Sequence, residues 1–120
     1  MTKPLYYRVD IENKGSQMIL VDPFQITEGS ASMVDVSKLY PNTHSGIAPF
    51  YTPPFRTVTI AWRVSTTGAI GQAQVQLNLP KEFTKEKGSC IDFYIYPEEQ
   101  RVEVAYDIVD PKTGQINTVR

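Results

Sequence analysis

Strict alternation of apolar and polar residues is the feature of this sequence that most restricts its fold. The clearest run is Thr57–Val64, and Gln72–Leu79 repeats the pattern after a glycine-containing stretch. Similar runs occur at Leu5–Glu12, Ile91–Tyr96 and Arg101–Ile108. Because successive side chains of a β-strand point to opposite faces, this period of two predicts strands with one buried and one solvated face. The first two runs together predict a hairpin.

Turn signals separate these runs. Pro97–Gln100 predicts a four-residue turn, and Asp110–Gly114 predicts another turn before a short C-terminal tail. We expect an all-β, antiparallel β-sandwich of about six to eight strands, immunoglobulin-like or related. It forms a single domain over residues 1–120. The polar face on each strand excludes a parallel sheet that is covered on both sides.

The apolar faces of these strands predict one core between two antiparallel sheets, with Trp62 as its largest member. A chain of 120 residues buries roughly two-thirds of its unfolded surface, so this core needs no disulfide or metal. The expected core residues are Val58, Ile60, Trp62, Ala73, Val75, Leu77, Ile91, Phe93, Ile95, Val102, Val104 and Tyr106.

Charge and residue counts exclude several functions. Twelve Lys and Arg against thirteen Asp and Glu leave no basic surplus for nucleic-acid phosphates. The apolar runs are far shorter than the roughly eighteen residues of a transmembrane helix. One histidine, His44, and one cysteine, Cys90, do not make an ordinary zinc site. We therefore expect a non-enzymatic protein without metal or cofactor; the alternative is a small-ligand domain or an enzyme that uses His44 and Cys90.

The segment Ser37–Phe55 departs from the alternation. It holds four of the nine prolines, four aromatic residues and the only histidine. Proline prevents regular strand pairing, so the segment predicts one long loop, and long loops often carry function. Its aromatic residues either bind a protein partner or fold back as a lid on the core. The partner-binding candidates here are Tyr40, His44, Phe50, Tyr51 and Phe55.

A second candidate surface lies in the acidic C-terminal part of the chain. Asp92, Tyr94 and Tyr96 share one strand face, and Glu103 is expected on the neighbouring strand. Acidic residues beside tyrosines suit an interface that attracts a basic partner, although an ordinary solvated sheet face gives the same pattern. Between the two surfaces we favour the loop, because its prolines reduce the entropy lost on binding.

Several stretches resemble one family of small bacterial domains. They are Val58–Trp62 after a proline-containing loop, Leu77–Pro80 at a strand end, and Ile91–Pro97 before the turn into Val102–Val104. Together they resemble lipoprotein-like domains of uncharacterised function that are encoded beside type VI secretion lipase effectors and are taken to be their immunity proteins.

The resemblance implies a binding protein that neutralises a cognate toxin effector by occluding its active site. It also implies a periplasmic location, with the cytoplasm as the alternative. A lipid anchor would then sit on a cysteine ahead of the printed sequence. A third alternative is an accessory module of a larger assembly.

Overall fold

Residues 7–27, 33–34, 38–50, 54–81, 83, 89–110 and 112–120 are described by the structure, a computed structural model. They form ten β-strands and one short 3-10 turn, which confirms the all-β fold class. The elements are β1 (Tyr7–Asn13), β2 (Ile19–Val21), β3 (Phe24–Gln25), β4 (Met33–Val34), β5 (His44–Phe50), β6 (Thr57–Val64), β7 (Ile70–Gln76), β8 (Cys90–Tyr96), the turn η1 (Pro97–Glu99), β9 (Arg101–Val109) and β10 (Ile116–Val119). Among the described residues, no helix has the length and apolar character needed to cross a membrane.

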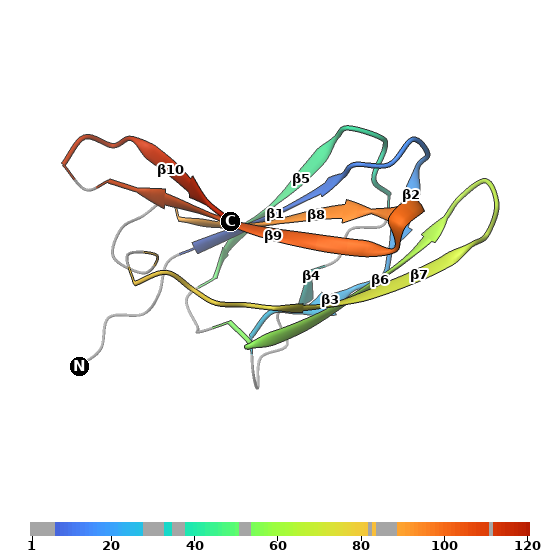
Figure 1. The fold of residues 1–120 in the computed structure, drawn as a ribbon, viewed down its shortest axis with the longest axis horizontal. Helices are drawn as coiled ribbons and strands as arrows, with labels where there is room; N and C mark the ends of the chain where they lie inside the picture. The colour runs from blue at the N-terminus through green and yellow to red at the C-terminus, as the bar shows by residue number, and fades with distance from the viewer. Residues whose placement is uncertain are drawn as a thin grey trace.

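Two β-sheets form the layers of a sandwich (Figure 1). The larger sheet has five strands in the order β10-β9-β8-β1-β5, and the smaller has three in the order β2-β6-β7. The short strands β3 and β4 pair with each other. Buried hydrophobic residues from both sheets form one cluster between the layers, as the alternation predicted.

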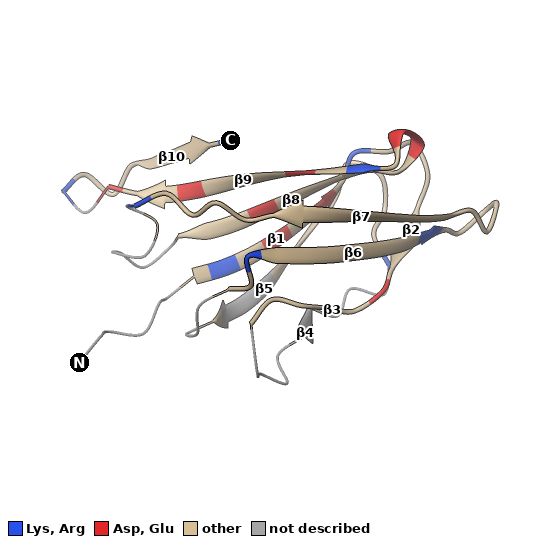
Figure 2. Cartoon of the chain, turned by 60° about the horizontal axis from the view of Figure 1, so that its bottom comes forward, with Lys and Arg blue, Asp and Glu red and all other residues tan. Residues whose placement is uncertain are grey.

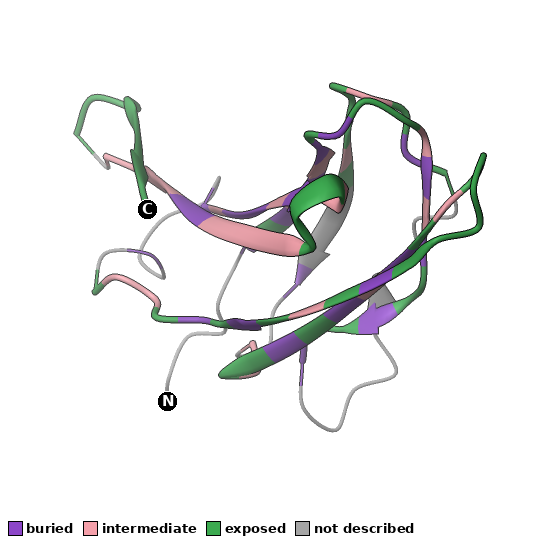
Figure 3. Cartoon of the chain, turned by 45° about the vertical axis from the view of Figure 1, so that its right-hand side comes forward, coloured by how far each residue is buried: buried purple, intermediate pink, exposed green. Residues whose placement is uncertain are grey.

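The expected core residues all belong to this cluster or pack against it. Nine of the twelve are buried: Val58, Ile60, Trp62, Val75, Leu77, Ile91, Phe93, Ile95 and Tyr106. The other three, Ala73, Val102 and Val104, are partly buried against the same cluster. Figure 3 shows buried and exposed segments alternating along the strands of the smaller sheet. The period of two therefore identified the inward face of each strand.

The predicted hairpin and the predicted turn at Pro97–Gln100 are both present. β6 pairs antiparallel with β7, and β8 pairs antiparallel with β9. Between β8 and β9, the turn η1 is followed by Gln100 in the left-handed region with φ of 50°. This tight turn fixes the register, so that Tyr96 lies opposite Arg101. The register in turn determines which side chains meet on the outer face.

One strand pair runs against the antiparallel expectation. β1 pairs antiparallel with β5 but parallel with β8. It corresponds to the expected strand Leu5–Glu12, of which residues 5 and 6 lie outside the described part of the chain. Parallel neighbours need a long crossover connection. Here the chain passes through the smaller sheet between the two strands. An alternating pattern is the same in either direction, so it does not reveal this pairing.

The segment Ser37–Phe55 is not one long loop, contrary to the expectation. Its central part, β5, pairs with β1 at an edge of the larger sheet. An edge strand has one side that needs no ladder partner, and this is where proline is tolerated within sheets. The register also shifts between Tyr7 and Val9, an irregularity that lets the two strands remain paired.

Phe50 is part of the core, so it does not act as an exposed binding residue. Its side chain is 8% exposed, and its ring stacks on Tyr7 with centroids 5.4 Å apart. Phe55 is half-buried against the same core, whereas Tyr51 lies outside the described residues. For Phe50 and Phe55, the structure therefore supports the lid alternative.

The C-terminal tail is a strand as well. β10 pairs antiparallel with β9 and extends the larger sheet, where the sequence predicted only a tail after the turn. Gly114 has a φ of +73°, a conformation that glycine adopts readily, and its N–H donates to the carbonyl of Asp110. Every residue of β10 is exposed (Figure 3), so the strand has no apolar face that periodicity could detect.

We expect Phe50→Ala to lower the free energy of unfolding by about 2 kcal/mol. This is less than for a central aromatic, because the ring lies on an edge strand and keeps some exposure. Chemical denaturation measures the change. Tyr40→Ala is the control, since Tyr40 is 57% exposed and should change stability by less than about 0.5 kcal/mol. Equal stability of the two variants would contradict the lid assignment.

Candidate functional site

The two sheets present chemically different faces to solvent. The exposed residues of β6 and β7 are mostly threonine and glutamine, such as Thr59, Gln72 and Gln74. The outer face of the larger sheet instead carries acids, bases, tyrosines and Cys90. Figure 2 shows charged segments along β1, β8 and β9, whereas β7 has none. The side chains that could react or bind a ligand thus lie mainly on the outer face of the larger sheet, hereafter called the outer face.

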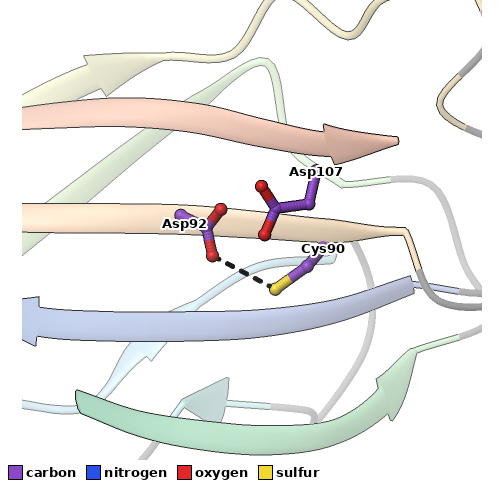
Figure 4. Close-up of side chains that lie close together, drawn as sticks. All are labelled: Cys90, Asp92 and Asp107. Atoms are coloured by element: carbon purple, nitrogen blue, oxygen red, sulfur yellow. Dashed lines mark hydrogen bonds between the residues drawn. The ribbon is translucent and has the colours of Figure 1, made fainter. Parts of the chain in front are cut away.

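A carboxylate–thiol cluster, formed by Cys90, Asp92 and Asp107, lies at one end of the outer face (Figure 4). Cys90 is directly opposite Asp107 in the β8–β9 ladder, and Asp92 follows Cys90 by two residues on the same face. The Cys90 thiol donates to Oδ1 of Asp92 across 3.4 Å. Oδ1 of Asp107 accepts a hydrogen bond of 2.6 Å from the Thr118 hydroxyl on β10.

Burial and like charge weaken ionisation within the cluster. The pKa of Asp92 is raised, first by burial and then by the hydrogen bond and negative charge of Asp107. The pKa of Cys90 is also raised, chiefly by burial and then by Asp92. When Asp92 is ionised, its buried Oδ2 has no hydrogen-bond partner. The cluster thus disfavours a second negative charge unless a proton or a cation balances it.

The cluster opens onto a pocket of about 290 Å³ that His44 also lines. Nδ1 of His44 lies 3.2 Å from Oδ1 of Asp10, a β1 residue paired in register with Asp92. His44 and Cys90 therefore share one pocket, as the enzyme alternative requires. However, a nucleophilic cysteine needs a lowered pKa, and the pKa of Cys90 is raised. Burial and the neighbouring Asp92 therefore disfavour a thiolate nucleophile at Cys90.

A tyrosine–arginine array occupies the other end of the outer face. It comprises Tyr94, Tyr96, Arg101, Glu103 and Arg120, and the ladder places Tyr94 opposite Glu103. The Glu103 carboxylate pairs with Arg101 at 2.6 Å and with Arg120 at 2.9 Å. The Arg101 guanidinium lies 3.9 Å from the Tyr96 ring centroid, and that of Arg120 lies 4.9 Å from the Tyr94 centroid. Hydrogen bonds, chiefly from Arg101, lower the pKa of Glu103.

The structure brings only some of the predicted site residues together. Asp92, Tyr94, Tyr96 and Glu103 share the outer face as expected, and His44 is exposed beside them on β5. Tyr40 is exposed outside the named strands. The loop candidates Phe50 and Phe55 pack on the core, so neither is the fully exposed anchor that the preference for the loop assumed.

Several site residues were missed by sequence reasoning. Asp107 was recoverable, because the turn at Pro97–Gln100 fixes the register that places it opposite Cys90. Arg101 was recoverable in the same way, because that register places it opposite Tyr96. Lys14 and Arg120 are basic residues that approach Tyr94 from outside β8 and β9. These contacts depend on tertiary structure, and they make the supposedly acidic surface one of mixed charge.

Comparison with known proteins assigns no family to this fold. No protein-family model matches the chain, and no curated protein matches its sequence. The functional argument therefore depends on the geometry of the outer face.

Proposed function

We propose that this chain is a non-enzymatic binding protein that recognises a protein partner through the tyrosine–arginine array. The observation that carries the proposal is that the array is already ordered by its own contacts. Glu103 holds Arg101 and Arg120 by charge-assisted hydrogen bonds, and both guanidinium groups stack on tyrosine rings. Tyrosine and arginine dominate the binding energy of many interfaces, and preordered side chains lose less entropy on association.

The contrast between the two sheets supports this choice of surface. The outer side of β6 and β7 is rich in threonine and glutamine and carries one exposed charged residue, Arg63, so it offers fewer of the aromatic and arginine residues that anchor interfaces. The half-buried Tyr94 and Tyr96 each offer a broad ring and a polar hydroxyl. The mixed charges of the array suit a partner surface that presents both acidic and basic groups.

For the partner, we propose a cognate secreted toxin, specifically a type VI secretion lipase effector, whose active site this chain would occlude. The resemblance described above supports this identity, and the raised pKa of Cys90 argues against a catalytic role of the chain's own thiol. The periplasm is the proposed location. An accessory role in a larger assembly would use the same surface but would not inhibit a lipase.

The proposal predicts that a lipase effector is encoded beside this chain, and binding to that effector tests it. We expect wild-type protein to bind that effector and inhibit its lipase activity. The double variant Tyr94→Ala, Tyr96→Ala should weaken binding by about 2 kcal/mol or more, roughly thirtyfold, because it removes both aromatic anchors. Isothermal titration calorimetry measures the affinity, and circular dichroism checks that the fold is retained.

Two single variants serve as controls. Tyr40→Ala removes an exposed tyrosine outside the array, and Gln74→Ala alters the outer side of the smaller sheet. Both should bind like the wild type. If the double variant also binds like the wild type, the array is not the binding surface. If wild-type protein neither binds nor inhibits the effector, the immunity assignment is wrong.

A further inference from the structure

The carboxylate–thiol cluster has the spacing of a metal site. One ligand atom from each of its three residues lies within 4.8 Å of the other two. The 3.4 Å between Sγ of Cys90 and Oδ1 of Asp92 is close to the separation of two ligands in a tetrahedral zinc site with bonds of about 2.0–2.3 Å. Small rotations of the side chains would complete the triangle. The β8–β9 register produces this spacing, because it sets Cys90 against Asp107.

An unpartnered carboxylate oxygen gives a second and independent indication of a ligand. Asp92 is only 5% exposed, and its buried Oδ2 has no hydrogen-bond partner while Asp92 and Asp107 are both ionised. The residue lines the pocket of about 290 Å³, and Figure 4 shows its carboxylate beside the Asp107 carboxylate and the Cys90 sulfur. Buried polar groups are rarely left unsatisfied, so an ion in this pocket would supply the missing interaction.

Local charge favours a cation. None of the salt bridges among the described residues involves Asp92 or Asp107. Asp10 adds a third carboxylate to the same pocket, in register with Asp92 on the neighbouring strand. Of the residues that line this pocket, Arg8 is the one permanent cation, and its side chain is exposed. The pocket therefore attracts positive charge.

We propose that Cys90, Asp92 and Asp107 bind one Zn²⁺ ion, with the cysteine as thiolate and each aspartate giving one oxygen. The sulfur ligand selects a borderline-soft metal, since Ca²⁺ and Mg²⁺ prefer oxygen ligands alone. Binding releases the thiol proton of Cys90 to solvent, together with any proton held between the aspartates. A fourth ligand, water or a side chain of a partner, would come from the open side of the pocket.

Thr118 is a positioning residue for this site. Its hydroxyl donates to Oδ1 of Asp107 and so fixes the orientation of that carboxylate. Outer-shell hydrogen bonds of this kind orient metal ligands. Through Thr118, a bound ion would link β8, β9 and the exposed strand β10.

The test uses the full chain without an affinity tag, because a histidine tag would bind zinc itself. Zn²⁺ is titrated in competition with a chromogenic chelator at neutral pH. We expect one equivalent to bind, and Cys90→Ala or Asp107→Asn to weaken binding by at least about tenfold, the minimum effect typical even of outer-shell changes. Asp22→Asn, which alters an exposed acid between β2 and β3, is the matched control and should leave the affinity unchanged.

Two measurements on wild-type protein decide the matter even if a variant fails to fold. Co²⁺ should give a thiolate-to-metal charge-transfer band, and Zn²⁺ should protect Cys90 from alkylation whereas Mg²⁺ should not. The proposal is overturned if Co²⁺ gives no such band and Zn²⁺ leaves alkylation unchanged. It is also overturned if folded Cys90→Ala and Asp107→Asn bind Zn²⁺ as tightly as wild-type protein does. The two aspartates would then share a proton in place of a metal.

Discussion

Replacement of Trp62 by alanine is expected to lower the free energy of unfolding by about 3–5 kcal/mol, a large share of the stability of a small domain. Trp62 is 1% exposed and is among the largest fully buried side chains. It lies on β6, the central strand of the smaller sheet, opposite Val21 on one side and Gly71 on the other. Its loss would leave a cavity between the layers that the surrounding strands cannot fill.

The residue opposite Trp62, Gly71, allows the same packing to be tested by adding a side chain in place of removing one. A Cβ added at Gly71 would overlap the indole ring, so Gly71→Ala should also destabilise, by about 1–3 kcal/mol. Gly46→Ala is the matched control, because its Cβ would meet only Arg8, at an ordinary 3.6 Å. Urea denaturation compares the variants. A Trp62→Ala protein as stable as wild type would contradict the assignment of Trp62 to the core.

Replacement of Asp92 by asparagine is expected to have a large effect of the opposite sign. In metal-free protein at pH 8, Asp92→Asn should raise the free energy of unfolding by about 2–4 kcal/mol. The pKa of Asp92 is raised to about 8 in the folded chain, first by burial and then by the hydrogen bond and negative charge of Asp107. In the unfolded chain the pKa is near the ordinary value of about 3.9. An amide in this position carries no charge, and it can donate to Asp107.

The sign of the pH dependence follows from these two values. Between about pH 4 and pH 8 the folded protein holds more protons at Asp92 than the unfolded chain, so wild-type stability should fall as the pH rises through this window. The difference between wild type and Asp92→Asn should therefore be small at pH 4 and largest at pH 8. Denaturation in a chelator-containing buffer measures it, with Asp22→Asn as a control. A difference that does not change with pH would show that ionisation of Asp92 is not the cause.

The fold was largely predictable because its core residues alternate. Val58, Ile60 and Trp62 face inward with a period of two, and the structure buries all three. A strand with one buried face shows alternating apolar residues in its sequence, whichever strand it pairs with. β10 shows no such alternation, because all its residues are exposed. Its pairing with β9 arises from the turn at Gly114 and from backbone hydrogen bonds, which residue types at the strand positions do not reveal.

The candidate site was predictable only within one hairpin. The pairing of Tyr94 with Glu103 follows from the turn length, so the sequence predicted that part of the outer face. The parallel neighbour β1 brings Asp10 beside Asp92, and Arg120 reaches Glu103 from the chain end. Both contacts join residues that only the complete topology brings together. Phe50 was assigned to a loop because the many prolines of its segment were taken as evidence against a strand. An edge strand, however, can contain proline.

The most direct test of the central claim, that the outer face binds the partner, is nuclear magnetic resonance mapping of the chain in complex with the neighbouring effector. Amide chemical shifts should change at Tyr94, Tyr96 and Glu103 on addition of the effector. Those of Gln72 and Gln74, on the outer side of the smaller sheet, should stay as they are in the free chain. Shift changes confined to the smaller sheet, or to residues around Tyr40, would contradict the claim.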